Sequence, residues 1–564
     1  MQRVPARWLK LATLLAVFAM IVPLAISTMP VAAQSGGKVL RVHHPTYPDV
    51  FDPQKSSYTN EIDILALAYE GLTKLNEKQE TVAAAAETWE YNADATTLTF
   101  HLRDGLKYSD GSPLTAENFR YAVERTCDPN TAGEYQSILF EIVGCADFAD
   151  LAVAVDEGTP APEIDQAAYD AAREKLGAKV IDDNTLELTF TQAAPYFHTI
   201  AYTWVFYPVK KEVADKDPDN WWKTAENHIG NGPFTVTGIE EDQQITFEAN
   251  DTYWQGRPKL DGIEYRYVED AAVALEAYRS GDLDIVQLEP PQIPEVQDDP
   301  ELSEAYVNYP TASTYTLAFN LKKAPFDDVN VRKAFSQAFD RETYCAEIRS
   351  GDCVPTLTWI PEGIPGHIES DKYGYDEEAA KASLAASKYG TAEKLGEITL
   401  AFNSDLSGAS DRAEFVAGEM QRVLGVKIKL EPTDGTTLTA ERKDNATHPQ
   451  AVLVGGWIQD YPDPQNWLSV YWTCASTFAE RVGYCNEKID DLIKQGDTTV
   501  DPEKRIGFYE QAGEMLIEDV PSPFLYNLAG VFVVNPKVTG YTPAASEVEW
   551  PGSLGSLMTI DITE

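Results

Sequence analysis

Apolar and polar residues alternate along this chain with two different periods, and each period predicts one type of element. Residues 38–45, KVLRVHHP, show a strand-like alternation, and residues 97–102 alternate as a half-buried strand does. Residues 61–72 follow the spacing of an amphipathic helix. Further strands are predicted over 185–190, 204–209, 234–238, 244–248, 398–402, 426–430 and 451–454. Further helices are expected from residue 116, capped by Thr115, over 331–339, 378–388 and 413–424, and in an Ala/Glu-rich insertion at 150–178.

Helices and strands alternate through both halves of the chain, which favours a mixed α/β protein. With 564 residues the chain is long enough for more than one domain. No fixed-period repeat points to a solenoid. Two long α/β regions with several crossings between them predict two lobes with a cleft, which is the usual place for a small ligand.

The first 33 residues differ from the rest of the chain. Basic residues precede an apolar run from Leu11 to Ile26, and small residues then lead to Ala33. This order is typical of a secretory signal peptide, residues 1–33, and it predicts an exported protein. An uncleaved N-terminal anchor is the alternative, because the apolar run is slightly long. The lack of a cysteine near the cleavage point argues against lipoprotein attachment, and no later stretch is apolar enough to span a bilayer.

Six cysteines occur as three pairs that are close in sequence. Export permits disulfides, and each short loop closed by one would contribute about 3 kcal/mol in the chain-entropy description. Unlinked thiols are the alternative, and zinc is disfavoured because no histidines are interleaved at ligand spacing. The pairings we expect are Cys127 with Cys145, Cys345 with Cys353, and Cys474 with Cys485.

The composition excludes some classes of function. A net charge of −45 is opposite to what phosphate binding requires, so nucleic acid is not expected as a partner. The chain contains no nucleophile elbow, zinc-protease motif, P-loop or dinucleotide fingerprint. We therefore expect no catalytic site, cofactor or metal, and a secreted hydrolase is a distant alternative. The 11 Trp, 28 Tyr and 21 Phe suit a large core or an aromatic ligand cleft.

The stretch from Gly455 to Pro464, GGWIQDYPDP, is unusual for a turn. It follows the apolar run at 451–454, so we expect the backbone to leave its sheet at the glycine pair. Turns are usually built from small polar residues, yet here a large aromatic, Trp457, and a carboxylate, Asp460, come together. Either these side chains face a ligand, or Asp460 caps the proline-containing turn and Trp457 belongs to the core.

Five blocks of sequence resemble, in order, the extracytoplasmic solute-binding proteins of peptide ABC transporters, the oligopeptide- and dipeptide-binding family (family 5). TFHLRDGLKYSDGSPLTA, residues 99–116, matches the most characteristic block. The matches run from about residue 38 to 545 and so cover nearly the whole predicted mature chain. The other blocks are NGPF at 231–234 continued by NDTYWQG at 250–256, AYRSGDLDI at 277–285, APFDDVNVRKAF at 324–335 followed by DRE at 340–342, and GGWIQDYPDP itself.

The resemblance implies an α/β fold of the two-lobed, hinged periplasmic-binding-protein type. One lobe carries an extra α/β subdomain, and the first lobe is discontinuous in sequence. The lobes of such proteins close on the ligand like a hinged trap. Transferred to this chain, the first lobe is 38–75, 205–310 and 526–564, its extra subdomain is 76–204, and the second lobe is 311–525.

The resemblance also implies which residues contact the ligand. The aspartate of the last block pairs with the free α-amino group of the ligand in this family, and that position is Asp460 here. Trp457 is expected to wall a side-chain pocket, and Gly456 is expected to let the ligand backbone approach closely. Tyr461 is expected at the same site, and Asn403 matches a position in the cleft.

The chain departs from the oligopeptide-binding pattern at three positions. Val454 stands where an arginine is expected, a histidine is missing near residue 409, and Ile458 replaces a cysteine that forms a disulfide in some relatives. Arg412 is close enough to substitute for the histidine, and Arg442 matches a basic residue that faces the C-terminal side of the peptide. The amine anchor is intact, while the carboxylate anchor, and with it the preferred peptide length, is left open.

The function implied by the resemblance is that of a non-enzymatic peptide-binding component of an ABC importer. It would capture a short peptide by lobe closure and dock on a membrane permease with its ATPase. We expect a monomer in the periplasm or at the cell surface. Three alternatives stay open: a non-peptide ligand such as an oligosaccharide, haem or a nickel chelate on the same fold, the hydrolase, and a peptide sensor or chaperone. Asp460 favours an amine, and the sparse histidines argue against a metal chelate.

Overall fold

The computed structural model describes residues 37–152 and 164–563. The predicted signal peptide, residues 1–33, lies outside these ranges, as does the middle of the insertion predicted at 150–178. From Lys38 onward the chain forms one compact unit. None of the helices in the described ranges has the length and apolar character needed to cross a membrane.

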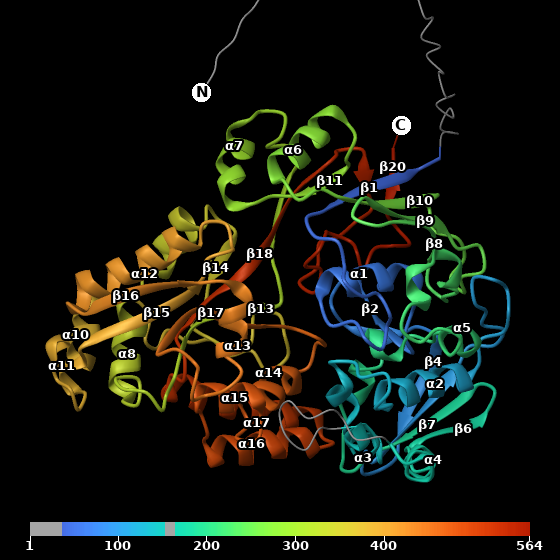
Figure 1. Ribbon diagram of the computed structural model, residues 1–564, viewed down its shortest axis with the longest axis horizontal. Coiled ribbons are helices and arrows are strands. Elements are labelled where there is room, and N and C mark those ends of the chain that lie inside the picture. The colour runs from blue at the N-terminus through green and yellow to red at the C-terminus, as the bar shows by residue number, and fades with distance from the viewer. Residues whose placement is uncertain (1–36, 153–163, 564) are drawn as a thin grey trace, which may run out of the picture. The chain divides into compact units, whose positions relative to one another are not determined.

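The largest sheet has twelve strands, and its hydrogen-bonded order is β16-β15-β17-β13-β18-β11-β1-β10-β9-β8, with β12 and β14 also paired to β18 (Figure 1). Parallel pairs, such as β1 with β10 and β15 with β16, occur beside antiparallel ones, such as β13 with β17. The strands are β1 (Val39–His44), β8 (Phe234–Glu240), β9 (Gln244–Ala249), β10 (Gly262–Tyr267), β11 (Ile285–Gln287), β12 (Tyr306–Pro310), β13 (Ser313–Phe319), β14 (Cys353–Pro355), β15 (Glu397–Asn403), β16 (Lys427–Thr433), β17 (Ala451–Ile458) and β18 (Phe524–Val534).

In the described ranges, three smaller sheets accompany the large one. The four-stranded sheet is antiparallel throughout, in the order β4-β5-β7-β6, and it is made of β4 (Ala86–Tyr91), β5 (Thr97–Leu102), β6 (Ala178–Asp182) and β7 (Thr185–Thr189). The two-stranded sheets pair β2 (Thr73–Leu75) with β3 (Thr81–Ala83) and β19 (Val538–Thr539) with β20 (Asp561–Ile562).

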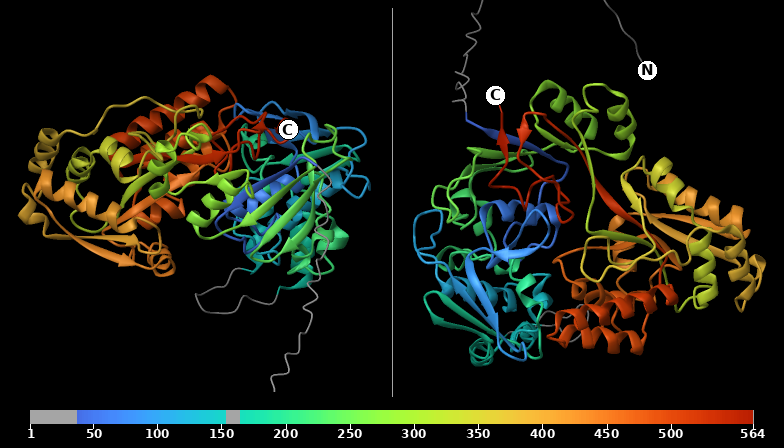
Figure 2. Two further views of the ribbon diagram at one scale, coloured as in Figure 1. Left: turned by 90° about the horizontal axis from the view of Figure 1, so that it is seen from above. Right: turned by 180° about the vertical axis from the view of Figure 1, so that it is seen from behind.

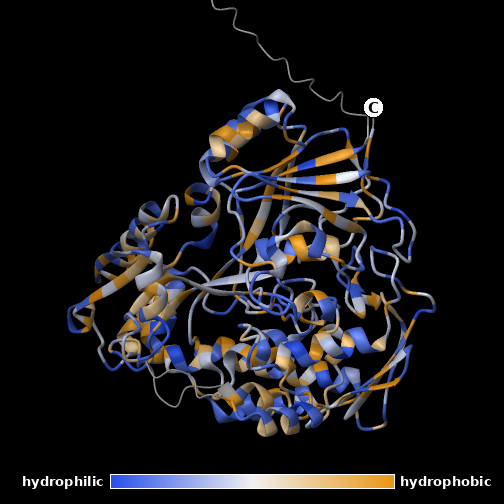
Figure 3. Cartoon of the chain, turned by 45° about the vertical axis from the view of Figure 1, so that its right-hand side comes forward, coloured by the Kyte–Doolittle hydropathy of each residue, from blue (hydrophilic) through white to orange (hydrophobic). Residues whose placement is uncertain are grey.

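The helices combine apolar and polar residues along their length (Figure 3). In α12, for example, the buried residues recur every three or four positions, as expected of a helix with one face on the core. The helices are α1 (Thr59–Ala68), α2 (Ala116–Cys127), α3 (Cys145–Ala149), α4 (Gln166–Glu174), α5 (Lys211–Ala214), α6 (Ala271–Ser280), α7 (Ile293–Asp298), α8 (Val329–Ala338), α9 (Arg341–Thr343), α10 (Glu377–Ala386), α11 (Ala392–Leu395), α12 (Ala409–Leu424), α13 (Gly435–Glu441), α14 (Pro464–Trp472), α15 (Thr477–Val482), α16 (Glu487–Thr498) and α17 (Pro502–Asp519).

Strand β18 joins two groups of elements. Its first part, up to Leu528, pairs with β13 and β14, and its second part, from Ala529, pairs with β12 and β11. Figures 1 and 2 show this strand in red, running from the elements around β1 to those around β13. Because ten of its eleven residues are buried, the strand is anchored by packing along nearly all of its length.

The buried apolar residues form separate cores on the two sides of β18. One core takes most of its residues from 40–265 and a few from 532–560. Two others take theirs from 317–526 and from 312–524. Separate cores are expected where a chain divides into lobes, and the domain boundaries given above stay a prediction.

Most of the predicted elements are confirmed, and three predictions are corrected. The helix expected over 61–72 ends at Ala68, because the backbone of the next residue, Tyr69, is extended. The strand expected over 204–209 is instead a short 3₁₀ turn, Trp204–Phe206. The carbonyls of Val205 and Tyr207 accept from the side chain of Gln54 rather than from a strand. Within the described part of 150–178, only a short 3₁₀ turn and α4 are helical, and β6 begins at Ala178.

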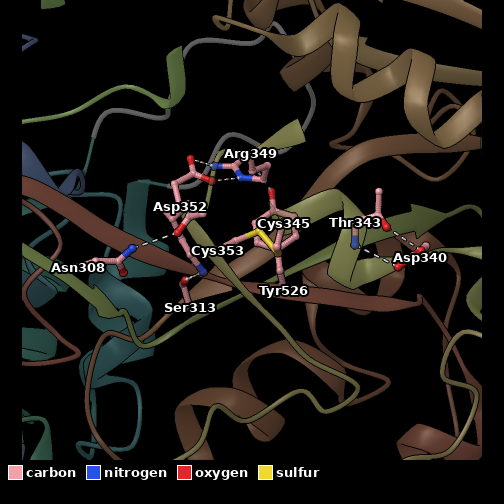
Figure 4. Close-up of a disulfide and its surroundings, with 11 residues drawn as sticks. Asn308, Ser313, Asp340, Thr343, Cys345, Arg349, Asp352, Cys353 and Tyr526 are labelled. Atoms are coloured by element: carbon pink, nitrogen blue, oxygen red, sulfur yellow. Dashed lines mark hydrogen bonds and ion pairs between the residues drawn. A yellow bond between two sulfur atoms is a disulfide. The ribbon is translucent and has the colours of Figure 1, made fainter. Parts of the chain in front are cut away.

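All three expected disulfides are confirmed: Cys127–Cys145, Cys345–Cys353 and Cys474–Cys485. Figure 4 shows Cys345–Cys353, which closes the loop before β14 beside Tyr526. Inside that loop Arg349 donates two hydrogen bonds of 2.6 Å to the carboxylate of Asp352. The disulfide and the buried ion pair therefore hold the same short loop.

Candidate functional site

Strand β17 continues through the glycine pair, so the prediction that the backbone leaves the sheet there is wrong. Gly455, Gly456 and Trp457 pair with Thr316, Tyr315 and Thr314 of β13. The pairing of β13 with β17 is irregular only at a shift of register between Thr316 and Leu317, which is typical of a β-bulge. A Cβ atom on Gly456 would lie 2.5 Å from the carbonyl oxygen of Thr314, so the neighbouring strand already requires glycine at this position.

Asp460 follows the end of β17 and is held by Asn466 on α14. The side-chain nitrogen of Asn466 donates to Oδ2 of Asp460 at 2.8 Å, and its side-chain oxygen accepts from the backbone N–H of Asp460 at 3.0 Å. The same oxygen accepts from Nε1 of Trp457 at 3.0 Å. One fully buried amide therefore orients both residues of the motif.

Two tyrosines distant in sequence also contact Asp460. The hydroxyl of Tyr135 donates to Oδ1 at 3.3 Å, and the hydroxyl of Tyr202 donates to the backbone carbonyl of Asp460. Both tyrosines pack against the core built mostly from residues 40–265, whereas Trp457 of the motif packs against the core of residues 312–524. The motif is thus hydrogen-bonded to side chains that belong to the other core.

The carboxylate of Asp460 has no cationic partner in the described residues: no nitrogen of a lysine, arginine or histidine there lies within 4.0 Å. Burial raises the pKa of Asp460 to about 6, and the hydrogen bonds from Asn466 and Tyr135 offset part of that rise. A buried carboxylate in this state gains strongly from a cation placed beside it.

Asp460 opens onto a cavity of about 480 Å³. Five tyrosines, two tryptophans and a phenylalanine line it, together with Gly456, Trp457 and Arg442. Trp457 itself stands edge-on to Tyr471 and Phe478, with ring centroids 5.6 and 5.1 Å apart. Cavities of similar size occur elsewhere in the described chain, so volume does not distinguish this one. What distinguishes it is that Gly456, Trp457 and Asp460 of the motif at 455–464 line its wall.

Arg442 supplies positive charge to the cavity wall. It follows α13, and no carboxylate of the described residues lies within 4.0 Å of its guanidinium nitrogens. Burial lowers the pKa of Arg442. The cavity therefore carries an unpaired carboxylate and an unpaired guanidinium, which suits a ligand with both charges.

The other predicted site residues lie outside this cavity. Tyr461 is buried in the core, 2 % exposed, and its hydroxyl donates to Gln465. Asn403 ends β15 and accepts from the backbone N–H of Asp405, while Arg412 is buried on α12. Their contact with a ligand stays a prediction.

Sequence reasoning missed Asn466, Tyr135 and Tyr202. Asn466 carries a local signal, because it lies in the first turn of the helix that Asp463 caps, directly after the motif. Tyr135 and Tyr202 are 325 and 258 residues away from Asp460, and no sequence pattern connects them to it. Nor do the described residues contain a group of three or more His, Cys, Asp or Glu that could hold a metal ion.

A polar, aromatic cavity between cores joined by one long strand is the arrangement of a two-lobed solute-binding protein. Residues 80–479 match the family described as bacterial extracellular solute-binding proteins, family 5, middle. The chain is 30% identical to the dipeptide-binding protein DppE of Bacillus subtilis over 519 residues, which are 90% of each chain. This chain belongs to family 5 of the bacterial extracellular solute-binding proteins.

Solved structures agree with this assignment. OppA of Haemophilus influenzae in complex with RPPGFSPFR is similar with a TM-score of 0.72 and 25% identity, over 94% of this chain and 99% of that one. The murein tripeptide binding protein MppA of Escherichia coli is similar in fold with a TM-score of 0.75 and 24% identity, over 94% and 99% of the two chains. The family resemblance and the two-lobed α/β fold expected from the sequence are thereby confirmed.

Proposed function

We propose that this protein is the substrate-binding component of an ABC importer and that it captures short peptides between its two lobes. One observation carries the proposal: a buried carboxylate, Asp460, faces the cavity with no cation beside it in the described residues. The α-amino group of a peptide would supply that cation. The names of DppE and of MppA, a dipeptide-binding and a murein tripeptide-binding protein, support a peptide as the ligand.

The physics favours an amine at Asp460. An ammonium that enters a closed cavity loses its water, which costs several kcal/mol unless a partner replaces the lost hydrogen bonds. A carboxylate already oriented by Asn466 replaces them through charge-assisted hydrogen bonds. Trp457 and Gly456 would line the path of the peptide, whose extended backbone can pair with the protein much as an added strand does.

Arg442 is the residue that we assign to the C-terminal side of the ligand. Its guanidinium lines the same cavity as Asp460, and a carboxylate would relieve its burial. The cavity is not lined by Asn403, Arg412 or Tyr461. Their proposed contact with the ligand therefore requires a movement of the lobes.

Capture would proceed by closure of the lobes around a hinge. We divide the chain into a first lobe of 38–75, 205–310 and 526–564 with its subdomain 76–204, and a second lobe of 311–525. Strand β18 crosses between the groups of strands that these segments contribute. The ligand would favour the closed state by contacting both lobes, and the closed form would dock on the permease and its ATPase.

The proposal assigns no reaction to the chain, and it places the protein outside the cytoplasm as a monomer, in the periplasm or at the cell surface. The aromatic walls of the cavity also suit a sugar, which stacks on tryptophan and tyrosine. An oligosaccharide is therefore the second candidate ligand, on the observation of eight aromatic side chains in the lining. The unpaired Asp460 favours the peptide, because a neutral sugar would leave the buried carboxylate without a cation.

Two measurements test the proposal. Native mass spectrometry of the purified protein, followed by denaturation, identifies any ligand that is released. Isothermal titration calorimetry then compares alanine peptides of increasing length with their N-acetylated forms. We expect free peptides to bind, and either N-acetylation or Asp460→Asn to weaken binding by about 100-fold.

Asp491→Asn is the matched control, because Asp491 is exposed on α16 and does not line the cavity. It should bind as the unchanged protein does. Release of a sugar or a chelate, or equal binding of the free and N-acetylated peptides, would overturn the assignment of Asp460 as the amine partner.

A further inference from the structure

The cavity wall carries a second group of charged residues, away from the motif at 455–464. Asp63 of α1 and Glu549, between β19 and β20 in sequence, both line the cavity. Neither belongs to a block of sequence that suggested a site. With Asp460, the described residues place three carboxylates in the wall, against the single guanidinium of Arg442.

A buried histidine lies between these two carboxylates. Nε2 of His44 is 3.8 Å from Oδ2 of Asp63, and its Nδ1 is 3.6 Å from Oε2 of Glu549. Only 2% of the His44 side chain is exposed, and its Nε2 has no hydrogen-bond partner in the described chain. Both distances are longer than a normal hydrogen bond. His44, Asp63 and Glu549 therefore do not satisfy one another's hydrogen-bonding capacity.

The two carboxylates differ in how well they are satisfied. Asp63 accepts from the hydroxyl of Tyr265 and from Nε1 of Trp550 at 3.1 Å. Glu549 accepts no hydrogen bond in the part of the chain that the structure describes, although only 15% of its side chain is exposed. Glu547, two residues earlier, shows the contrast: four backbone N–H groups donate to it.

The negative charge of Asp63 and Glu549 exceeds the positive charge that His44 can supply, so a cation beside them would be stabilised. A protonated His44 would compensate one of the two carboxylates at most. Leaving a second carboxylate largely buried and unpaired costs free energy that an incoming cation would recover. The aromatic walls add to this preference, since the faces of tyrosine and tryptophan rings attract cations.

We infer that Glu549 forms a second ionic subsite, which binds the cationic side chain of a lysine or arginine residue of the peptide. The inference rests on the proposed function, because it assumes a peptide held at Asp460. It makes Glu549 a specificity-determining residue: the amine anchor accepts any peptide, and Glu549 selects those with a basic residue at one position. His44, whose Nδ1 lies 3.6 Å from Oε2 of Glu549, would be its positioning residue.

The test is calorimetry with tetra-alanine peptides in which each position in turn carries lysine or its uncharged isostere norleucine. We expect lysine to bind more tightly than norleucine at one position, by about tenfold, which is the worth of one charge-assisted hydrogen bond. In Glu549→Gln the ratio of the two affinities at that position should fall to about one. Glu304→Gln, which changes an exposed glutamate, should keep the ratio.

The outcomes separate this inference from the proposed function. Equal binding of lysine and norleucine peptides at every position, or a lysine preference that survives in Glu549→Gln, would overturn the subsite and leave the peptide-binding role standing. Failure of all peptides to bind would overturn both. Thermal unfolding of Glu549→Gln shows whether the variant is folded, and the norleucine peptides report on its cavity independently of charge.

Discussion

Asn466 contacts Asp460 through both atoms of its side-chain amide, donating to the carboxylate at 2.8 Å and accepting from the backbone N–H at 3.0 Å. Asn466 is fully buried on α14, so the carboxylate is oriented by a helix rather than by a free loop. A carboxylate oriented before the ligand arrives loses little conformational freedom on binding, and this raises affinity. Asn466 is thus a positioning residue of the proposed amine site.

Replacing Asn466 by alanine should weaken peptide binding by about tenfold, because Asp460 loses a hydrogen bond that favours its charged form. The same loss raises the pKa of Asp460, so the pH below which affinity falls should move upward. Calorimetry over a range of pH measures both effects. Trp457→Phe is the comparison, because it removes the hydrogen bond that Trp457 donates to Asn466 and leaves Asp460 in place. If the pH profile of binding were unchanged in Asn466→Ala, Asn466 would not be a positioning residue.

Gly456→Ala should lower the free energy of unfolding by about 2 kcal/mol, as overpacking does in a well-packed interior. The reason is the 2.5 Å approach of the new Cβ atom to the carbonyl oxygen of Thr314. Gly418→Ala is the matched control, because Gly418 lies in α12, is exposed, and its Cβ would meet nothing within 4 Å. That variant should gain up to about 1 kcal/mol from helix propensity. Urea unfolding gives the free energy of unfolding of both variants. Equal changes in that free energy would contradict the prediction.

Much of the fold could be predicted from the sequence, because elements with one buried face leave a periodic pattern. Strand β5 and helix α8 show that pattern plainly and appear where they were expected. The segment 204–209 has the apolar content of a strand, but its first residues form a turn that lies against helices α1 and α2. Trp204 donates to the carbonyl of Ser56 instead of pairing in a sheet. Apolar content predicts burial, and only pairing partners decide whether a buried segment is a strand.

The candidate site was predictable in part. Asp460, Trp457, Gly456 and Arg442 were expected from the family resemblance, and they line one cavity. Glu549 could not be found in this way, because its significance comes from burial next to His44, more than 500 residues away in sequence. In so acidic a chain a single glutamate carries no signal until the structure shows that it is largely buried and accepts no hydrogen bond in the described residues.

Removing the disulfide Cys345–Cys353 by a double change to serine should lower the free energy of unfolding by about 2–3 kcal/mol. The bond closes a loop that separates its cysteines by 8 residues, and the same loop holds the buried pair of Arg349 and Asp352. Guanidinium unfolding of the double variant measures the loss. A reducing agent should destabilise the unchanged protein more than the variant, and equal sensitivity of the two would show that this disulfide contributes nothing.

Peptide affinity should be highest between about pH 6 and pH 8. In the ligand-free protein burial raises the pKa of Asp460 to about 6, and a bound ammonium favours the ionised carboxylate. Below that pKa the carboxylate must lose a proton to bind, so affinity falls by up to about tenfold for each pH unit. Above about pH 8 the α-amino group of the peptide loses its own proton.

The same linkage sets a sign for stability. A carboxyl group whose pKa is raised by folding binds more protons in the folded state, so ionisation of Asp460 lowers the stability of the ligand-free protein as pH rises from about 4 to 6. A bound peptide removes that cost, so the ligand-induced rise in Tm should be larger at pH 7 than at pH 5. In Asp460→Asn the acid limb of the affinity profile should vanish. An acid limb that persists in this variant would assign the titration to another carboxyl of the cavity, such as Asp63, whose pKa is also raised to about 6 by burial.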